Sequence, residues 1–275
     1  MRGGERVMET RVEQHASQTC KSILLLAGSF TFTFLLGEMI HEFGHYLSHL
    51  AYSSPGVQVH LDPFGGSRIM GVTSLPEDVM GITSAAGPLF NLILGVTFLL
   101  LLWRERKPVL LPLILWGPVA MVQEGVTFSL GLLTPGGDAQ WIAAAGVPKV
   151  VILAAGILLM FVGIALIARL IPLIGIKRRD SFWRKYSILI VGMCSLMFIR
   201  STNSTLASPE TMMENLIPLV FSLLLAVGVV LLHIPLTSFV KPMLITQHNP
   251  VTWPVVALAL TLGTSLFLFQ IVALN

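Results

Sequence analysis

The hydrophobic residues of this 275-residue chain form long runs that are almost free of charge, rather than the alternating stripes of a soluble fold. A helix that crosses the hydrocarbon core of a bilayer needs about 20 mostly apolar residues. The runs therefore predict seven membrane-spanning helices, or six if the short run at 186–199 does not cross. They lie at 22–51, 79–103, 108–133, 150–174, 186–199, 215–240 and 251–274.

Composition supports this class of protein. Hydrophobic residues make up 54% of the chain and charged residues only 11%, whereas a soluble domain carries about 25% charged residues. These values exclude a disordered chain, a collagen-like chain and an ordinary soluble enzyme. We expect an integral, multi-pass protein of a bacterial-type cell membrane. No nucleic-acid partner is expected, because Lys and Arg are not clustered with aromatic residues.

The runs divide the chain into three parts. Residues 1–21 are polar and predict an N-terminal tail. Residues 22–175 hold the first four spans and form the membrane-embedded core, and residues 176–275 contain a basic linker and the remaining helices.

The segment 57–73, between the first two spans, has a different pattern. Val57, Val59 and Leu61 alternate with polar residues, the turn-forming sequence Asp-Pro-Phe-Gly-Gly follows at 62–66, and 68–73 can return as a second strand. This pattern predicts a β-hairpin at the membrane surface. The alternative is an irregular surface loop.

The sequence His41-Glu42-Phe43-Gly44-His45 is an H-E-x-x-H motif inside the first predicted span. Residues four apart lie on one face of a helix, about 6 Å apart along its axis, so both imidazoles can bind one zinc ion. Glu42 is close enough to act on a water bound to that ion. Three ionisable groups within five residues of a span are costly and indicate function. The alternative is a polar helix end near the headgroups.

Zinc in a catalytic site has three protein ligands and one open position. His49 is about 12 Å along the helix from His41, too far to share one ion, and we expect it to be a polar interfacial residue. Asp138 follows Pro135-Gly136-Gly137 after the third span, on the same side of the membrane as His45. Because Pro and Gly break the helix there, the backbone can bend back into the protein interior, and we predict Asp138 as the third ligand.

Two alternatives to this assignment stay open. Asp138 can instead be the N-cap of a helix at 139–146. Glu124, an acid inside the third span that requires a partner, is the alternative ligand. If that span is straight, Glu124 lies about 21 Å from Asp138, and the two cannot serve one ion.

Asn91 follows Gly87-Pro88 near the start of the second span, again on the same side. Its amide can hydrogen-bond the backbone of a bound peptide or of the loop before Asp138. Equally, it can form an interhelical bond, with the neighbouring small residues allowing close helix packing.

These three motifs, in this order on membrane spans, resemble the site-2 protease family of intramembrane zinc metalloproteases. The similarity covers about residues 22–174. It implies that His41, His45 and Asp138 bind Zn²⁺ and that Glu42 is the catalytic base. It also implies that the hairpin engages the substrate, a membrane-anchored protein.

The expected fold is therefore an all-α polytopic membrane protein with a small β-hairpin after the first helix. The expected activity is zinc-dependent hydrolysis of a peptide bond in or near a transmembrane segment. One alternative is an inactive, metal-binding regulatory member of the same family. A second is a transporter in which Gln123, Glu124 and His233 form a pathway.

Overall fold

The computed structural model defines most of the chain in detail. The residues it describes are 2–52, 56–61, 67–71, 75–105, 107–133, 136–176, 180–207, 227–228 and 251–272.

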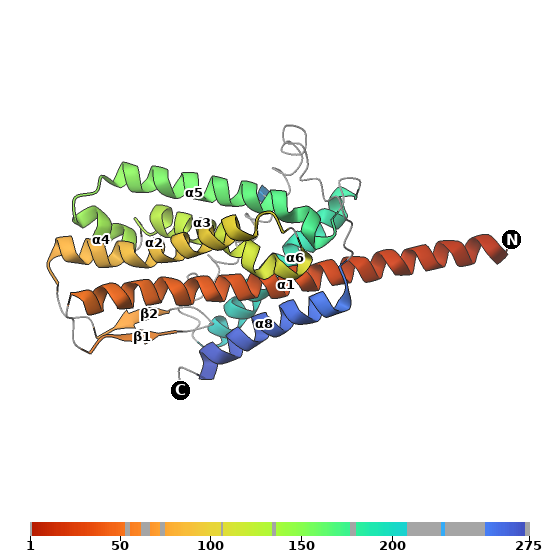
Figure 1. Ribbon diagram of the computed structural model, residues 1–275, viewed down its shortest axis with the longest axis horizontal. Coiled ribbons are helices and arrows are strands. Elements are labelled where there is room, and N and C mark those ends of the chain that lie inside the picture. The colour runs from red at the N-terminus through yellow and green to blue at the C-terminus, as the bar shows by residue number, and fades with distance from the viewer. Residues whose placement is uncertain are drawn as a thin grey trace.

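Helix α1 (Arg2–Ala51) is the longest element and runs through the centre of the molecule. At 1.5 Å per residue its 50 residues extend about 75 Å, well beyond a hydrocarbon core of about 30 Å. The polar residues predicted as a separate tail continue α1 as a helix, and Figure 1 shows this end projecting from the bundle. The apolar part that can cross a membrane is Glu13–Ala51.

Most of the remaining helices follow the predicted hydrophobic runs closely. Two short 3₁₀ turns, Pro108–Leu110 and Ile171–Ile174, adjoin α3 and α5. The helices are α2 (Glu77–Leu102), α3 (Leu111–Leu130), α4 (Asp138–Ala144), α5 (Lys149–Leu170), α6 (Phe182–Ala207) and α8 (Trp253–Val272).

Within the described residues, five helices are long and apolar enough to cross a membrane, which indicates an integral membrane protein. They contain α1, α2, α3, α5 and α8. The predicted span 186–199 falls inside α6, which is not one of the five found among the described residues. The predicted span 215–240 lies outside the described residues, apart from 227–228.

The predicted hairpin is confirmed. Strands β1 (Gln58–His60) and β2 (Arg68–Met70) pair antiparallel, with Val59 opposite Ile69. The second strand is shorter than the predicted 68–73, and the predicted turn at 62–66 lies outside the described residues. Both strands lie beside the C-terminal part of α1 (Figure 1).

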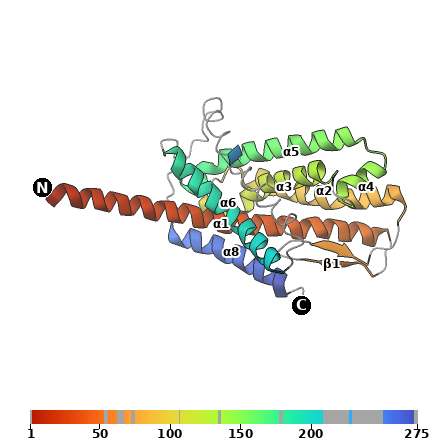
Figure 2. The ribbon, with the colours of Figure 1, turned by 180° about the vertical axis from the view of Figure 1, so that it is seen from behind.

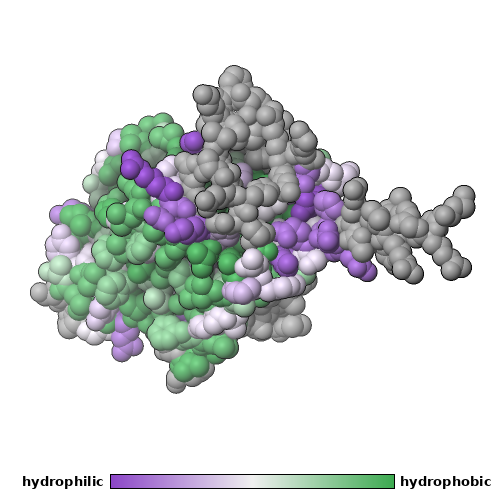
Figure 3. All heavy atoms as spheres, turned by 45° about the vertical axis from the view of Figure 1, so that its right-hand side comes forward, coloured by the Kyte–Doolittle hydropathy of each residue, from purple (hydrophilic) through white to green (hydrophobic). Residues whose placement is uncertain are grey.

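The surface of the bundle is that of a protein surrounded by lipid. Large apolar side chains are exposed along the outer faces of α2 and α5, including Leu100, Leu101, Val150 and Phe161. Hydrophobic residues cover most of the described bundle in Figure 3, and hydrophilic residues gather where α1 leaves it and in a second group on the visible face. The all-helical membrane fold with a small hairpin is thus the observed one.

Helices α2, α3, α6 and α8 pack against α1, whereas α5 packs against α3. Gly28 of α1 faces the backbone of Ala259, and Gln270 of α8 donates a hydrogen bond to the carbonyl oxygen of Leu35 at 3.1 Å. Helix α6 crosses α1 on the opposite side of the molecule from the view of Figure 1, as Figure 2 shows. The C-terminal part of the chain therefore supports the helix that carries the H-E-x-x-H motif.

Candidate metal centre

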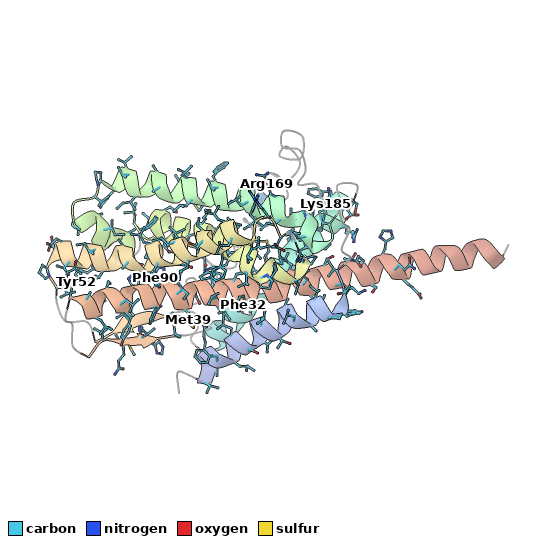
Figure 4. All side chains as sticks on the ribbon, viewed as in Figure 1. Phe32, Met39, Tyr52, Phe90, Arg169 and Lys185 are labelled. Carbon is cyan, nitrogen blue, oxygen red and sulfur yellow. The ribbon has the colours of Figure 1, made fainter. Side chains whose placement is uncertain are left out.

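Two histidines of α1 bring their ring nitrogens together near the end of the helix. His41 and His45 are one turn apart, and their rings meet edge to face with centroids 4.7 Å apart. The two Nε2 atoms are separated by 3.0 Å. Figure 4 shows Phe90 of α2 beside the stretch of α1 between Met39 and Tyr52, which contains both histidines.

Asp138 lies beside the two rings, as the sequence predicted. One carboxylate oxygen, Oδ2, lies 3.2 Å from Nε2 of His41 and 3.4 Å from Nε2 of His45. Asp138 is the first residue of α4, and the N-cap is Gly137. The alternative of an N-cap role for Asp138 therefore does not apply.

The chain reverses between α3 and α4 to bring Asp138 into place. Gly136 adopts a positive φ of 74°, a conformation that few other residues adopt easily. The side chain of Gln140 accepts a hydrogen bond from the Gly136 amide at 3.3 Å and donates one to the carbonyl oxygen of Leu132 at 3.2 Å. The side chain of Gln140 thus holds the start of α4 against the loop that precedes it.

The three donor atoms have the spacing that a metal ion requires. A tetrahedral ion with ligands at about 2.0–2.1 Å separates its donors by about 3.3–3.4 Å. The observed separations of 3.0, 3.2 and 3.4 Å are close to this value. Two imidazoles and one carboxylate, of which His45 is buried and the other two are partly buried, can therefore hold a divalent cation.

The charge state of Asp138 suits this role. Burial by itself would raise its pKa, but hydrogen bonds and positive charge from His41 and His45 outweigh burial and hold the pKa below its ordinary value. The carboxyl is then ionised at neutral pH, as a metal ligand must be. The side chains of Asp138 and His41 remain 21% and 15% exposed, so solvent reaches this edge of the site.

Glu42 follows His41 on α1 and is largely buried. Its carboxyl interacts electrostatically with His41, His45 and Asp138, which places it within range of the donor cluster. The ring of the next residue, Phe43, is exposed and lies against Tyr46 and Phe90, so it points away from the donor cluster.

Glu124 is not among the three clustered donors. Both of its carboxylate oxygens lie 3.1 Å from Nδ1 of His41, on the side of the ring away from Asp138. The two acids therefore flank one imidazole, and the straight span for which a separation of about 21 Å was expected is not formed. The reason is that α3 ends at Leu130, after which the chain turns back.

Asn91 is buried between helices. Its amide nitrogen donates to Glu124 at 2.6 Å, and its amide oxygen accepts from the indole of Trp116 at 2.9 Å. With 1% of its surface exposed, Asn91 forms the interhelical bonds that the sequence offered as one of two alternatives. Contact between Asn91 and a substrate stays a prediction.

Close contact between α1 and α2 positions the second histidine. A Cβ atom on Gly44 would lie 2.9 Å from Cα of Gly87, and one on Gly87 would lie 2.7 Å from two ring carbons of His45. Both distances are shorter than an ordinary carbon contact. Nδ1 of His45 is 2.7 Å from the carbonyl oxygen of Thr83, one turn before Gly87.

His49 lies outside the cluster, as expected from its distance along the helix. Its side chain is buried, and its Nδ1 has no hydrogen-bond partner within the described residues. The sequence did not predict that Thr83 would contact His45 or that Trp116 would contact Asn91. A backbone carbonyl leaves no trace in a sequence, whereas a Trp inside a span can indicate a polar partner for its N–H.

No protein-family model, curated protein or solved structure matches this chain.

Proposed function

We propose that this protein is an intramembrane zinc metalloprotease, resembling the site-2 proteases, that hydrolyses a peptide bond in or near a transmembrane segment of a membrane-anchored protein. The observation that carries the proposal is the meeting of His41, His45 and Asp138 at metal-binding distances, on an apolar helix and beside Glu42.

The donor set favours zinc. Two imidazole nitrogens and one carboxylate oxygen form a three-ligand set of the kind that catalytic zinc sites use, with a fourth position left for water. Calcium and magnesium favour sites composed of oxygen ligands. When bound, zinc supplies a water of lowered pKa and polarises the scissile carbonyl.

Glu42 is the catalytic residue of the proposed reaction. Its carboxylate takes a proton from the attacking water and then delivers that proton to the nitrogen of the departing amine. Proton transfer by a positioned side chain contributes about 10²–10⁴-fold to a rate. The partly exposed edge at Asp138 gives water access to the cluster.

The hairpin offers a way to hold the substrate. A helical substrate must unwind to expose its scissile carbonyl, and an extended peptide can add to the edge of a small sheet through main-chain hydrogen bonds. Strands β1 and β2 adjoin the C-terminal part of α1, the part that carries the motif. We therefore propose a multi-pass protein of a bacterial-type cell membrane that engages its substrate along this sheet.

The test compares the wild-type protein with Glu42→Gln, both purified as the full chain in detergent. Zinc per chain is measured by mass spectrometry, and cleavage is followed with fluorescent transmembrane peptides that contain a helix-destabilising segment. Glu42→Gln should retain zinc, because its ligands are intact, and should lose about 10²–10⁴-fold in cleavage rate.

A chelator, followed by added zinc, provides the control: cleavage should disappear and then return. Cleavage by Glu42→Gln at the wild-type rate would remove Glu42 from the mechanism. Stoichiometric zinc with no cleavage of any peptide by the wild-type protein would instead favour the inactive, regulatory relative.

A further inference from the structure

A chain of buried polar groups leads from the middle of the bundle to the first histidine. Nε1 of Trp116 lies 2.9 Å from Oδ1 of Asn91, and Nδ2 of Asn91 lies 2.6 Å from Oε1 of Glu124. Glu124 in turn contacts Nδ1 of His41 at 3.1 Å. Trp116, Asn91 and Glu124 are at most 3% exposed, so none of them depends on solvent for its partners.

The donor and acceptor roles along this chain follow from chemistry. An indole N–H can only donate, so the atom of Asn91 that faces Trp116 must be its oxygen. The amide nitrogen then faces Glu124 and donates to the carboxylate. The carboxylate oxygens of Glu124 face Nδ1 of His41 and accept the hydrogen bond that this nitrogen donates. In the neutral ring with its proton on Nδ1, the lone pair of His41 lies on Nε2 and is available to a metal ion.

The second histidine is fixed in the same tautomer by a simpler contact. A carbonyl oxygen accepts but does not donate, so Nδ1 of His45 carries the proton directed to Thr83. Both rings therefore present Nε2 to the position between them and Asp138. Thr83, Gly87 and Asn91 follow one another at intervals of four residues, and one face of α2 controls both rings.

We propose that Asn91, Glu124 and Trp116 are positioning residues that hold His41 as the Nδ1-protonated tautomer and aim Nε2 at the metal ion. A carboxylate on the outer nitrogen of a ligating histidine fixes the ring and strengthens it as a ligand. A purely structural role as interhelical contacts would stabilise the bundle without changing metal affinity. The inference rests on the proposed metal site, but it does not require proteolysis.

The test measures the zinc dissociation constant of the full-length protein in detergent, by competition with a chromophoric chelator. Glu124→Gln and Asn91→Ala should each weaken zinc binding by about 10–100-fold, the usual effect of losing such a partner. Thr127→Val is the matched control, because Thr127 lies one turn further along α3 and its hydroxyl donates to the carbonyl oxygen of Gln123 on its own helix.

A double variant shows whether Asn91 affects zinc affinity through Glu124 or independently of it. If Asn91 acts through Glu124, Asn91→Ala should have little further effect on zinc affinity once Glu124→Gln is present. The visible absorption spectrum of the cobalt-substituted protein should also change in Glu124→Gln and stay unchanged in Thr127→Val. Trp116→Phe keeps the ring and removes only the N–H, and should weaken binding less than Asn91→Ala.

The outcomes are distinguishable. Wild-type zinc affinity in folded Glu124→Gln and Trp116→Phe, with only the thermal stability of the apoprotein lowered, would overturn the positioning role. Additive losses in the double variant would overturn the relay from Asn91 to Glu124. Absence of zinc binding by the wild-type protein would refute the metal site itself, and with it the proposed function.

Discussion

Replacing Gly87 with alanine adds one methyl group at the point where α2 touches the ring of His45. The new Cβ would lie 2.7 Å from Cδ2 and Cε1 of that ring. Carbon atoms in ordinary contact are about 3.5 Å apart or more, so the ring or the helix must retreat by about 0.8 Å. The ring has little room to move, because Thr83 and His41 hold it at 2.7 and 3.0 Å.

A displacement of this size is large for a metal ligand. Distances in a metal site vary by only about 0.2 Å, and a site held more loosely than about 0.5 Å loses its geometry. We expect Gly87→Ala to weaken zinc binding by at least about 10–100-fold, comparable to the loss of a supporting partner. Cleavage of a transmembrane peptide should fall by about 10²-fold or more.

The assay is chelator competition for zinc on the purified variant, with Gly95→Ala as the matched control. Gly95 lies two turns further along α2, where a Cβ would meet Cα of Gly117 at 3.1 Å, so the substitution crowds a helix contact without touching a histidine. Circular dichroism checks the helix, because a Cβ before Pro88 also crowds the proline ring. Equal zinc affinity in folded Gly87→Ala and wild-type protein would refute the reasoning.

Two further predictions concern the third ligand and the hairpin. Asp138→Ala should lower the zinc content of the purified protein, whereas His49→Gln, the control further along α1, should leave it unchanged; metal analysis that found full zinc in Asp138→Ala would move the third ligand elsewhere. Val59→Pro removes an N–H from β1 and should disturb its pairing with Ile69. Peptide cleavage should then slow while zinc content stays the same, and unchanged cleavage would exclude the hairpin from substrate binding.

The sequence by itself determined the features that depend on local spacing. Runs of apolar residues determine where helices can cross a membrane, because a backbone surrounded by lipid must satisfy its hydrogen bonds internally. The four-residue interval between His41 and His45 determines that both rings share one helix face. The helix-breaking residues 135–137, together with the shared side of the membrane, favoured Asp138 as the third ligand, because Pro and Gly end helices through local geometry.

Only the tertiary structure decided how the helices lie against one another. The sequence identified Glu124 and Asn91 as polar groups that need partners, but their contacts join residues 83 and 33 positions apart along the chain. Which groups meet depends on how whole helices pack. At Gly87 the absence of a Cβ lets α2 approach the ring of His45. Local spacing carries no record of that packing, and so the support of the two imidazoles emerged only from the folded chain.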